Sequence, residues 1–429
     1  MDVEIKKQVE IQVSQPSWKQ RWGWYLFDFA NSILIINGTL YFPQWLVVDN
    51  KVSGSIYNLI ALLTSILLII SAPFFGARAD KNNKCFFYLS LNSLGLFISG
   101  LALSVAGLYM QAGTGRNVAC LICFGAVLYF YQLSLVFYNA LLNPLAKAGE
   151  VSKVSGVGLA WGWIGGIVAV IAIDPVVKGH LFFHTANRMN ALLPSAIAFG
   201  ILTALSLYLM RTLEKPNVVL SPQAHRSIFA LYRDLKAFPI LLAFIAAFFL
   251  YSDAILTLEN NVTIFMEKVF GIDDDAKAMA FVVFLLLGAV AAGTEWGLST
   301  PQKSLKALRC CMWGWVIALA VACFAPGSWT FYAVFLVMGI LYGILYNSSR
   351  VLFFQLIPKE KIAEYFGLYA SFERFASIIG PLLWSIPLVF RPQEDAISYR
   401  AAIGMLILPV VVSIYLLYIV RKKLDNGMN

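Results

Sequence analysis

Residues 55–108 carry the pattern that decides the fold: they read SIYNLIALLTSILLIISAPFFGARADKNNKCFFYLSLNSLGLFISGLALSVAGL. Two long apolar runs, at 55–77 and 86–108, are separated by a short loop that holds every charged residue of the stretch. A helix needs about 20 apolar residues to cross a bilayer, so each run is long enough to span a membrane. The stretch therefore predicts two membrane-spanning helices joined by a tight polar turn.

The same alternation continues along the whole chain. Hydrophobic residues make up 60% of the 429 residues and charged residues only 13%, whereas a soluble domain averages roughly 45–50% and about 25%. A bilayer must be the solvent for such a chain, so we expect an all-α integral membrane protein. Twelve apolar runs are expected to form spans, at about 23–48, 55–77, 86–108, 118–143, 154–174, 192–210, 238–266, 277–297, 308–325, 329–350, 364–389 and 398–420.

The widest polar gap, at 211–237, divides these runs into two sets of six. Two equal halves of six helices are typical of transporters built from repeats. The predicted organisation is an N-terminal tail at 1–21, a first six-helix half at 22–210, a central loop at 211–237, a second half at 238–420 and a C-terminal tail at 421–429.

The basic residues are distributed unevenly between the two sides of the predicted bundle. If the N-terminus is cytosolic, 23 Lys and Arg residues fall on the cytosolic side and 8 on the other, with Arg374 inside a span. Cytosolic loops of membrane proteins carry an excess of Lys and Arg, so both termini are expected to be cytosolic. The same bias accounts for the net charge of +9 without nucleic-acid binding.

Several kinds of chemistry are not indicated. No phosphate-binding G-x-x-x-x-G-K-[ST] segment occurs, which argues against an ATP-driven pump. His180 and His184 have the spacing of a metal pair, but they fall in a polar loop and are interpreted as solvated histidines. Cys120 and Cys123 fall inside a span and are interpreted as small buried side chains. We expect no enzyme, no metal, no cofactor and no channel filter.

Ionisable side chains inside a bilayer are costly unless paired or hydrated, so each is a functional candidate. These residues are Asp28, Asp253, Glu259, Glu295, Arg350, Glu373 and Arg374. Asp253 and Arg374 are expected near the midplane, where they could line the pathway or form a structural ion pair. The residues predicted to bind substrate or take part in coupling are Asp253, Arg374, Glu373, Glu259, Asn260 and Trp161.

The loop after the second run has a familiar pattern. Gly76-Ala-Arg78-Ala-Asp80-Lys81-Asn-Asn-Lys84 resembles the loop motif of the major facilitator superfamily, with Asn in place of the second Gly of that motif. Asn is the other residue that tolerates a left-handed backbone. The resemblance implies that Asp80 contacts a helix N-terminus and latches the outward-facing state.

Further stretches resemble one branch of that superfamily, the vacuolar amino-acid effluxers linked to autophagy and their bacterial relatives. They lie in order from about residue 22 to 381: Phe27-Asp28-Phe29-Ala30-Asn31-Ser32, Phe137-Tyr138-Asn139-Ala140-Leu141-Leu142, Val154-Ser155-Gly156-Val157-Gly158, Trp161-Gly162-Trp163-Ile164-Gly165-Gly166, Tyr251-Ser252-Asp253-Ala254, Ser349-Arg350, Leu356-Ile357-Pro358, Phe366-Gly367-Leu368-Tyr369 and Gly380-Pro381. The sequence departs from the family pattern at Phe29, Ser252, Ala254, Tyr346 and Asn347, changes that could mean a different substrate.

The resemblance implies a major facilitator fold and a monomeric, gradient-driven transporter that works by alternating access, in a bacterial inner membrane. Its expected partners are a small polar solute, the lipid bilayer and a coupling proton. Amino acids and efflux are the first choice; uptake of another nutrient and a membrane enzyme are the alternatives. The residues expected to form the inner gate are Asp28, Asn31, Ser32, Tyr138, Asn139, Arg350, Gly76, Arg78 and Asp80.

Overall fold

The computed structural model describes residues 17–52, 54–147, 149–213, 238–294, 298–375, 379–390 and 395–425, and these ranges contain helices and no strand. The first half consists of α2 (Trp18–Gln44), α3 (Gly54–Asn82), α4 (Cys85–Tyr109), α5 (Thr114–Ala140), α7 (Val151–Val177) and α8 (Leu192–Met210). The second half consists of α10 (Pro239–Phe270), α11 (Asp274–Gly293), α12 (Pro301–Phe324), α13 (Ser328–Leu356), α14 (Ile362–Phe375), α15 (Ile379–Phe390), α16 (Ala396–Met405) and α17 (Ile407–Asp425). Short segments at Trp45–Asp49, Leu142–Leu145, Arg188–Ala191 and Lys359–Lys361 complete the described helices.

The helices account for the twelve expected spans. Nine stretches of the described chain are long and apolar enough to cross a membrane, and two shorter apolar stretches occur at Met279–Gly293 and Ile379–Phe390. The twelfth is α2, which has 27 residues and is rich in Trp, Tyr and Asn. The expected all-helical membrane architecture is therefore confirmed.

Local sequence signals fix where several helices begin and end. The Ser17 hydroxyl accepts the backbone N–H of Gln20 while the Gln20 side chain accepts that of Ser17, which is a complete capping box at the start of α2. Between α10 and α11, Gly271 adopts a left-handed φ of 64° and Asp273 caps the next helix. The Asn that replaces Gly in the loop after α3, Asn83, adopts φ 52°, which agrees with the sequence interpretation.

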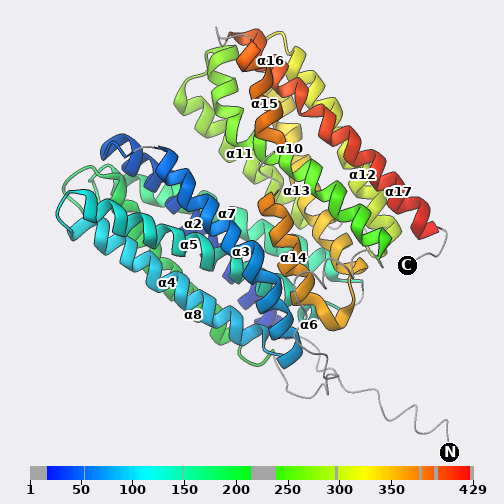
Figure 1. Cartoon of the computed structure of the whole chain (residues 1–429), viewed down its shortest axis with the longest axis horizontal. Coiled ribbons are helices and arrows are strands. Elements are labelled where there is room, and N and C mark those ends of the chain that lie inside the picture. The colour runs from blue at the N-terminus through cyan, green and yellow to red at the C-terminus, as the bar shows by residue number, and fades with distance from the viewer. Residues whose placement is uncertain are drawn as a thin grey trace, which may run out of the picture.

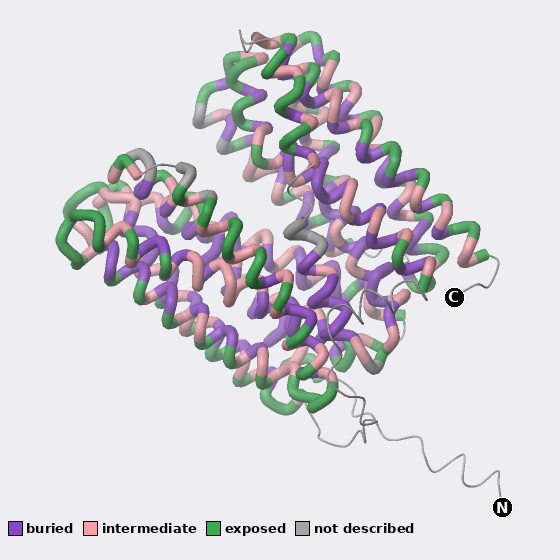
Figure 2. The backbone as a smooth tube through the Cα atoms, viewed as in Figure 1, coloured by how far each residue is buried: buried purple, intermediate pink, exposed green. Residues whose placement is uncertain are grey.

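Each half is a closely packed bundle with an apolar surface. In the first half α2 packs on α7 and α8, and α4 packs on α5 and α8; in the second, α13 packs on α11 and α12, and α17 packs on α10 and α12. Large apolar side chains such as Leu67, Ile70 and Phe74 are exposed on the outside of α3. Figure 2 shows buried residues gathered inside each half and where the halves meet.

We call the end of the bundle that carries Trp18 and Asp425 the inner end, and the opposite end the outer end. The halves meet through α3 with α14 and through α7 with α11 and α13, and Figure 1 shows them diverging away from the inner end. The burial of α3 agrees with contact between the halves at the inner end. Among its described residues, the buried ones begin at Leu68 and continue through Ala72 and Gly76 to Ala79, toward the inner end. Toward the outer end, α15 buries only Gly380 and Trp384. This conformation is closed at the inner end and open at the outer end.

Candidate functional site

The structure brings three residues predicted for the inner gate together from three helices. Asp28 lies on α2, Tyr138 on α5 and Arg350 on α13, so the cluster contains two residues of the first half and one of the second. The Arg350 guanidinium carbon lies 5.8 Å from the centre of the Tyr138 ring. Its charge also acts on the Asp28 carboxylate. We call Asp28, Tyr138 and Arg350 the gate cluster.

Tyr138 is held rigidly at the centre of the gate cluster. Its ring is fully buried and stacks on Trp24 with the ring centres 4.2 Å apart and the planes 6° apart. The Trp24 indole N–H also donates to the backbone carbonyl of Tyr138 at 2.9 Å. Two glycines of α7 leave space for the cluster, because a Cβ at Gly158 would lie 2.8 Å from Tyr138 Oη and one at Gly162 would lie 2.7 Å from Asp28 Oδ2.

Several polar atoms around the gate cluster are buried without a partner among the described residues. They are Arg350 Nη1, Asn139 Oδ1, Ser348 Oγ and both polar side-chain atoms of Asn31. Buried polar groups in proteins almost always have a hydrogen-bond partner, and each exception needs an explanation. A polar solute or water that enters from the outer end would supply such partners. Ser32 is half-buried on α2 beside Asn31.

Two sets of polar contacts close the inner end. On one side, Asp80 of α3 accepts the backbone N–H groups of Ala363 at 3.0 Å and Glu364 at 2.7 Å. Both donors belong to the first turn of α14, whose unpaired N–H groups and dipole favour a carboxylate. Gly76 lets the helices approach, since a Cβ there would overlap the carbonyl of Ala363. Arg78 is exposed.

On the other side, Asn347 of α13 reaches both neighbouring helices. Its amide nitrogen lies 3.2 Å from the carbonyl oxygen of Ser152 on α7 and 3.2 Å from that of Ala292 on α11. Gly156 of α7 is next to this contact: a Cβ at that position would overlap the Ala292 carbonyl and lie 2.7 Å from the Asn347 amide. Because Gly156 has no side chain, the backbone of α7 lies directly against the backbone of α11 in the other half.

The predicted midplane residues are not gathered in one place. Asp253 is fully buried and its carboxylate accepts the backbone N–H of Gly380 at the start of α15. The side chains of Glu373 and Arg374 lie outside the described residues, as does all of Glu295. The pairing of Asp253 with Arg374 therefore stays a prediction.

Of the other predicted substrate residues, Glu259 and Asn260 lie on α10, and Trp161 lies on α7 next to Gly162, which borders the gate cluster. Glu259 accepts a hydrogen bond from Tyr342, and Asn260 is exposed. Trp161 packs against two aromatic residues of α2, with its ring centre 5.4 Å from that of Trp22 and 5.9 Å from that of Phe29.

Sequence reasoning did not single out the closing role of Asn347 or the contact between Trp163 and Tyr342. Asn347 was visible as a polar residue inside an apolar run and as a departure from the family pattern. The pairing of Trp163 on α7 with Tyr342 on α13, whose ring centres are 5.2 Å apart, has no signal in the sequence, because residues far apart in the chain meet there.

Comparisons with known proteins agree with this architecture. Residues 143–428, more than half of the chain, match the family described as vacuole effluxer Atg22 like. The MFS-type transporter YxiO of Bacillus subtilis is 24% identical over 438 residues, which cover 94% of this chain and 95% of that protein. A protein of Aquifex aeolicus is 27% identical over 410 residues, which cover 93% and 96%.

Fungal relatives match a smaller part. Autophagy-related protein 22-1 of Aspergillus niger is 25% identical over 162 residues, which cover 34% of this chain and 26% of that protein. Among solved structures, an outward-facing bacterial homologue of the iron transporter ferroportin superposes with a TM-score of 0.71 at 13% identity, covering 94% of this chain and 98% of that one. FucP, a major facilitator transporter in the outward conformation, gives 0.70 at 14% identity, with coverage of 94% and 97%. The chain therefore belongs to the vacuole effluxer Atg22-like family and is a membrane transporter of the major facilitator superfamily.

Proposed function

We propose that this transporter moves a small zwitterionic solute, with amino acids as the first candidates, by alternating access. The single observation that carries this proposal is the gate cluster. It places an acid from one half and a base from the other around the buried Tyr138 hydroxyl, which interacts with both of them. An amino acid carries both a carboxylate and an ammonium group, so it complements both charges.

In this proposal the solute acts on the contact between the halves. A solute carboxylate would bind the Arg350 guanidinium, whose planar donors suit carboxylates, and its ammonium group would bind Asp28. The bound solute then replaces the attraction between Asp28 and Arg350 that helps hold the inner end closed. A ligand shifts such an equilibrium only by its difference in affinity for the two conformations, and the gate cluster is a place where that difference can arise.

Purified protein in liposomes tests the proposal directly. We would measure uptake and efflux of a panel of labelled amino acids, sugars and nucleosides, with and without a pH gradient. Saturable flux of one or more amino acids, in excess of that in protein-free liposomes, is the expected result. Flux of sugars or nucleosides alone would overturn the amino-acid assignment and favour uptake of another nutrient.

We further propose that the inner end faces the cytosol of a bacterial cell. The excess of Lys and Arg on the loops of that end supports this orientation. In a variant whose six native cysteines are replaced, a cysteine at exposed Lys268 should react with an impermeant reagent in intact cells, and one at exposed Lys422 should not. Labelling at Lys422 without labelling at Lys268 would reverse the orientation.

The contact of Asp80 with α14 predicts a shift in the balance between conformations. Asp80→Asn removes the negative charge. It also leaves one side-chain oxygen to accept the two backbone N–H groups that two oxygens accept in the wild type. Charge at a helix N-terminus contributes about 0.3–2 kcal/mol, so the inner-closed population should fall by up to roughly thirtyfold relative to inner-open. Distances between spin labels at the inner end would report this change. An unaltered distance distribution in a folded Asp80→Asn variant would show that Asp80 is not a latch.

A further inference from the structure

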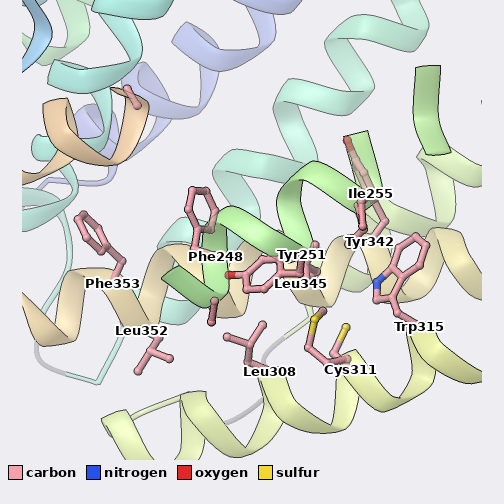
Figure 3. Packing of buried hydrophobic residues seen from close by; sticks show 14 of the residues in the cluster. Phe248, Tyr251, Ile255, Leu308, Cys311, Trp315, Tyr342, Leu345, Leu352 and Phe353 are labelled. Atoms are coloured by element: carbon pink, nitrogen blue, oxygen red, sulfur yellow. The ribbon is translucent and has the colours of Figure 1, made fainter. Parts of the chain in front are cut away.

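A second buried carboxylate lies inside the second half, away from the gate cluster. Glu259 of α10 lines a small cavity, with room for about one water molecule, whose other walls are Ile255, Leu258, Val262, Phe281, Phe284, Trp315, Phe335 and Tyr342. Figure 3 shows three of the lining residues, Ile255, Tyr342 and Trp315. Among the described residues that line the cavity, Glu259 is the only one with an acidic or basic side chain.

Glu259 has one hydrogen-bond donor among the described residues. Tyr342 Oη donates to Glu259 Oε2 at 3.1 Å, and among the side chains that the structure describes it is the one titratable group that acts on Glu259. The Trp315 indole nitrogen, on the same cavity wall, is buried without a described partner. A carboxylate in an apolar membrane interior is costly when ionised, unless it is paired or hydrated.

The charged side chains that the structure describes on the surrounding helices pair elsewhere, are exposed or lie at helix ends. On α10 itself, Asp253 accepts from Gly380 of α15 and Glu267 pairs with Lys277 of α11. Arg400 of α16 donates to the carbonyl of Cys323. Of the remaining described ones, Glu364 of α14 lies at the inner end beside Asp80, Arg309 of α12 stacks on Tyr418 of α17, Arg350 of α13 belongs to the gate cluster, and Arg421 and Asp425 of α17 pair with each other. Lys268, Lys303, Lys306 and Lys422 are exposed, and Lys423 lies in the last turn of α17. The side chains of Asp274 and Asp275 of α11 and of Glu373 and Arg374 of α14 lie outside the described residues. α15 carries no charged residue, and Tyr346 of α13 packs on Tyr342 with ring centres 4.6 Å apart.

The donor to Glu259 is also a contact between the two halves. The Tyr342 ring lies 5.2 Å from that of Trp163 on α7 of the first half. Gly288 of α11 makes room for this tryptophan, since a Cβ there would lie 3.2 Å from its ring. Any opening of the inner end that separates α7 from α11 and α13 must alter the Trp163–Tyr342 contact. The side chain that hydrogen-bonds the carboxylate therefore senses the relative position of the halves.

We propose that Glu259 is a proton-binding site, coupled through Tyr342 and Trp163 to the movement of the two halves. This inference rests on the proposed transport by alternating access and names its coupling ion. The Glu259 carboxylate takes one proton to become the neutral acid in the dry cavity of the inner-closed conformation. Opening of the inner end frees Tyr342 from Trp163 and admits water, and the proton leaves. By linkage, a ligand that binds one conformation better shifts the population toward it, so acidic pH favours the inner-closed conformation.

The test measures conformation against pH and needs no solute. Spin labels at exposed Lys153 of α7 and Lys303 of α12 report the separation of the halves at the inner end, in a variant without the six native cysteines. The wild-type distance should lengthen as pH rises, and Glu259→Gln should abolish this dependence. Glu267→Gln is the matched control, because it makes the same change at an exposed carboxylate of the same helix and should leave the dependence intact.

Tyr342→Phe keeps the inference falsifiable if Glu259→Gln does not fold. It removes the hydroxyl that favours the ionised carboxylate but keeps the ring on Trp163, so the midpoint of the pH dependence should move to higher pH. An infrared band of a protonated carboxyl group, lost in Glu259→Gln and retained in Glu267→Gln, should accompany the conformational change. A pH-independent wild type, an unchanged Glu259→Gln or an unmoved Tyr342→Phe midpoint would each overturn the proton site.

Failure of this inference and failure of the proposed function are distinguishable. Amino-acid flux that is insensitive to pH and to Glu259→Gln would remove the proton site and leave the transport proposal standing. A pH-dependent conformation that Glu259→Gln abolishes, in a protein that moves no amino acid in the panel, would retain the proton site and overturn the proposed substrate.

Discussion

Arg350→Ala should abolish transport while the protein remains inserted and folded. Asp28 and Arg350 are half-buried, so removing one of these two interacting charges should cost about 2 kcal/mol, the lower end of the range for buried pairs, which corresponds to a loss of flux of roughly thirtyfold. Asp28→Asn should have an effect of the same kind, because it removes the opposite charge of the gate cluster. Flux in proteoliposomes, thermal stability and the inner-end label distance would be measured on both variants.

Arg309→Ala is the matched control for Arg350→Ala. Arg309 stacks on Tyr418 at 5.1 Å, much as Arg350 stacks on Tyr138 at 5.8 Å, but Arg309 and Tyr418 both lie in the second half. Arg309→Ala should therefore change the thermal stability of the protein without abolishing transport.

Exchanging the two charges of the gate cluster, Asp28→Arg with Arg350→Asp, distinguishes a structural pair from a solute-binding pair. A purely structural pair would recover transport in the exchange, whereas solute binding would not; near-normal flux in Arg350→Ala would rule out the gate cluster as a solute site.

Gly156→Ala should make the inner-closed conformation the minor one. The added Cβ would overlap the backbone carbonyl of Ala292 on the other half, and a backbone atom cannot rotate away as a flexible side chain can. Overpacking of this kind costs about 1–3 kcal/mol, enough to shift the ratio of conformations by roughly five- to 150-fold. Spin labels at Lys153 and Lys303 should report a longer distance, and flux should fall because the return step is impeded.

Gly293→Ala is the control on the same interface. A Cβ at Gly293 would lie 3.6 Å from the Cβ of Ala160, which is an ordinary van der Waals contact, so this variant should keep the wild-type distance and flux. If Gly156→Ala keeps the wild-type distance distribution while remaining folded, the close approach of α7 and α11 is not what limits closure at the inner end.

Much of the architecture is determined by the sequence alone. The apolar runs at 55–77 and 86–108 form α3 and α4. The expected polar loop is a short turn at Asn83 and Lys84, since α3 continues to Asn82, and Asn83 adopts the left-handed backbone that its place in the motif required. Hydropathy is a local property, since a segment of about 20 apolar residues must become a helix wherever it enters the bilayer. The contact of Asp80 with a helix N-terminus was also expected, because the motif is short and contiguous.

Tertiary structure alone decided which side chains meet. Asp28, Tyr138 and Arg350 were each predicted for the inner gate, but only the fold placed an acid and a base from opposite halves around one buried hydroxyl. Asp253 was expected at the midplane, and the fold gave it the backbone N–H of Gly380 as a partner. Glu259 acquired its donor, Tyr342, from a helix more than 80 residues away in the chain. The local sequence sets the chemistry of each side chain and its depth in the membrane. The partner of each side chain depends on how the helices pack and rotate against one another. The alternation of apolar and polar residues does not encode that packing.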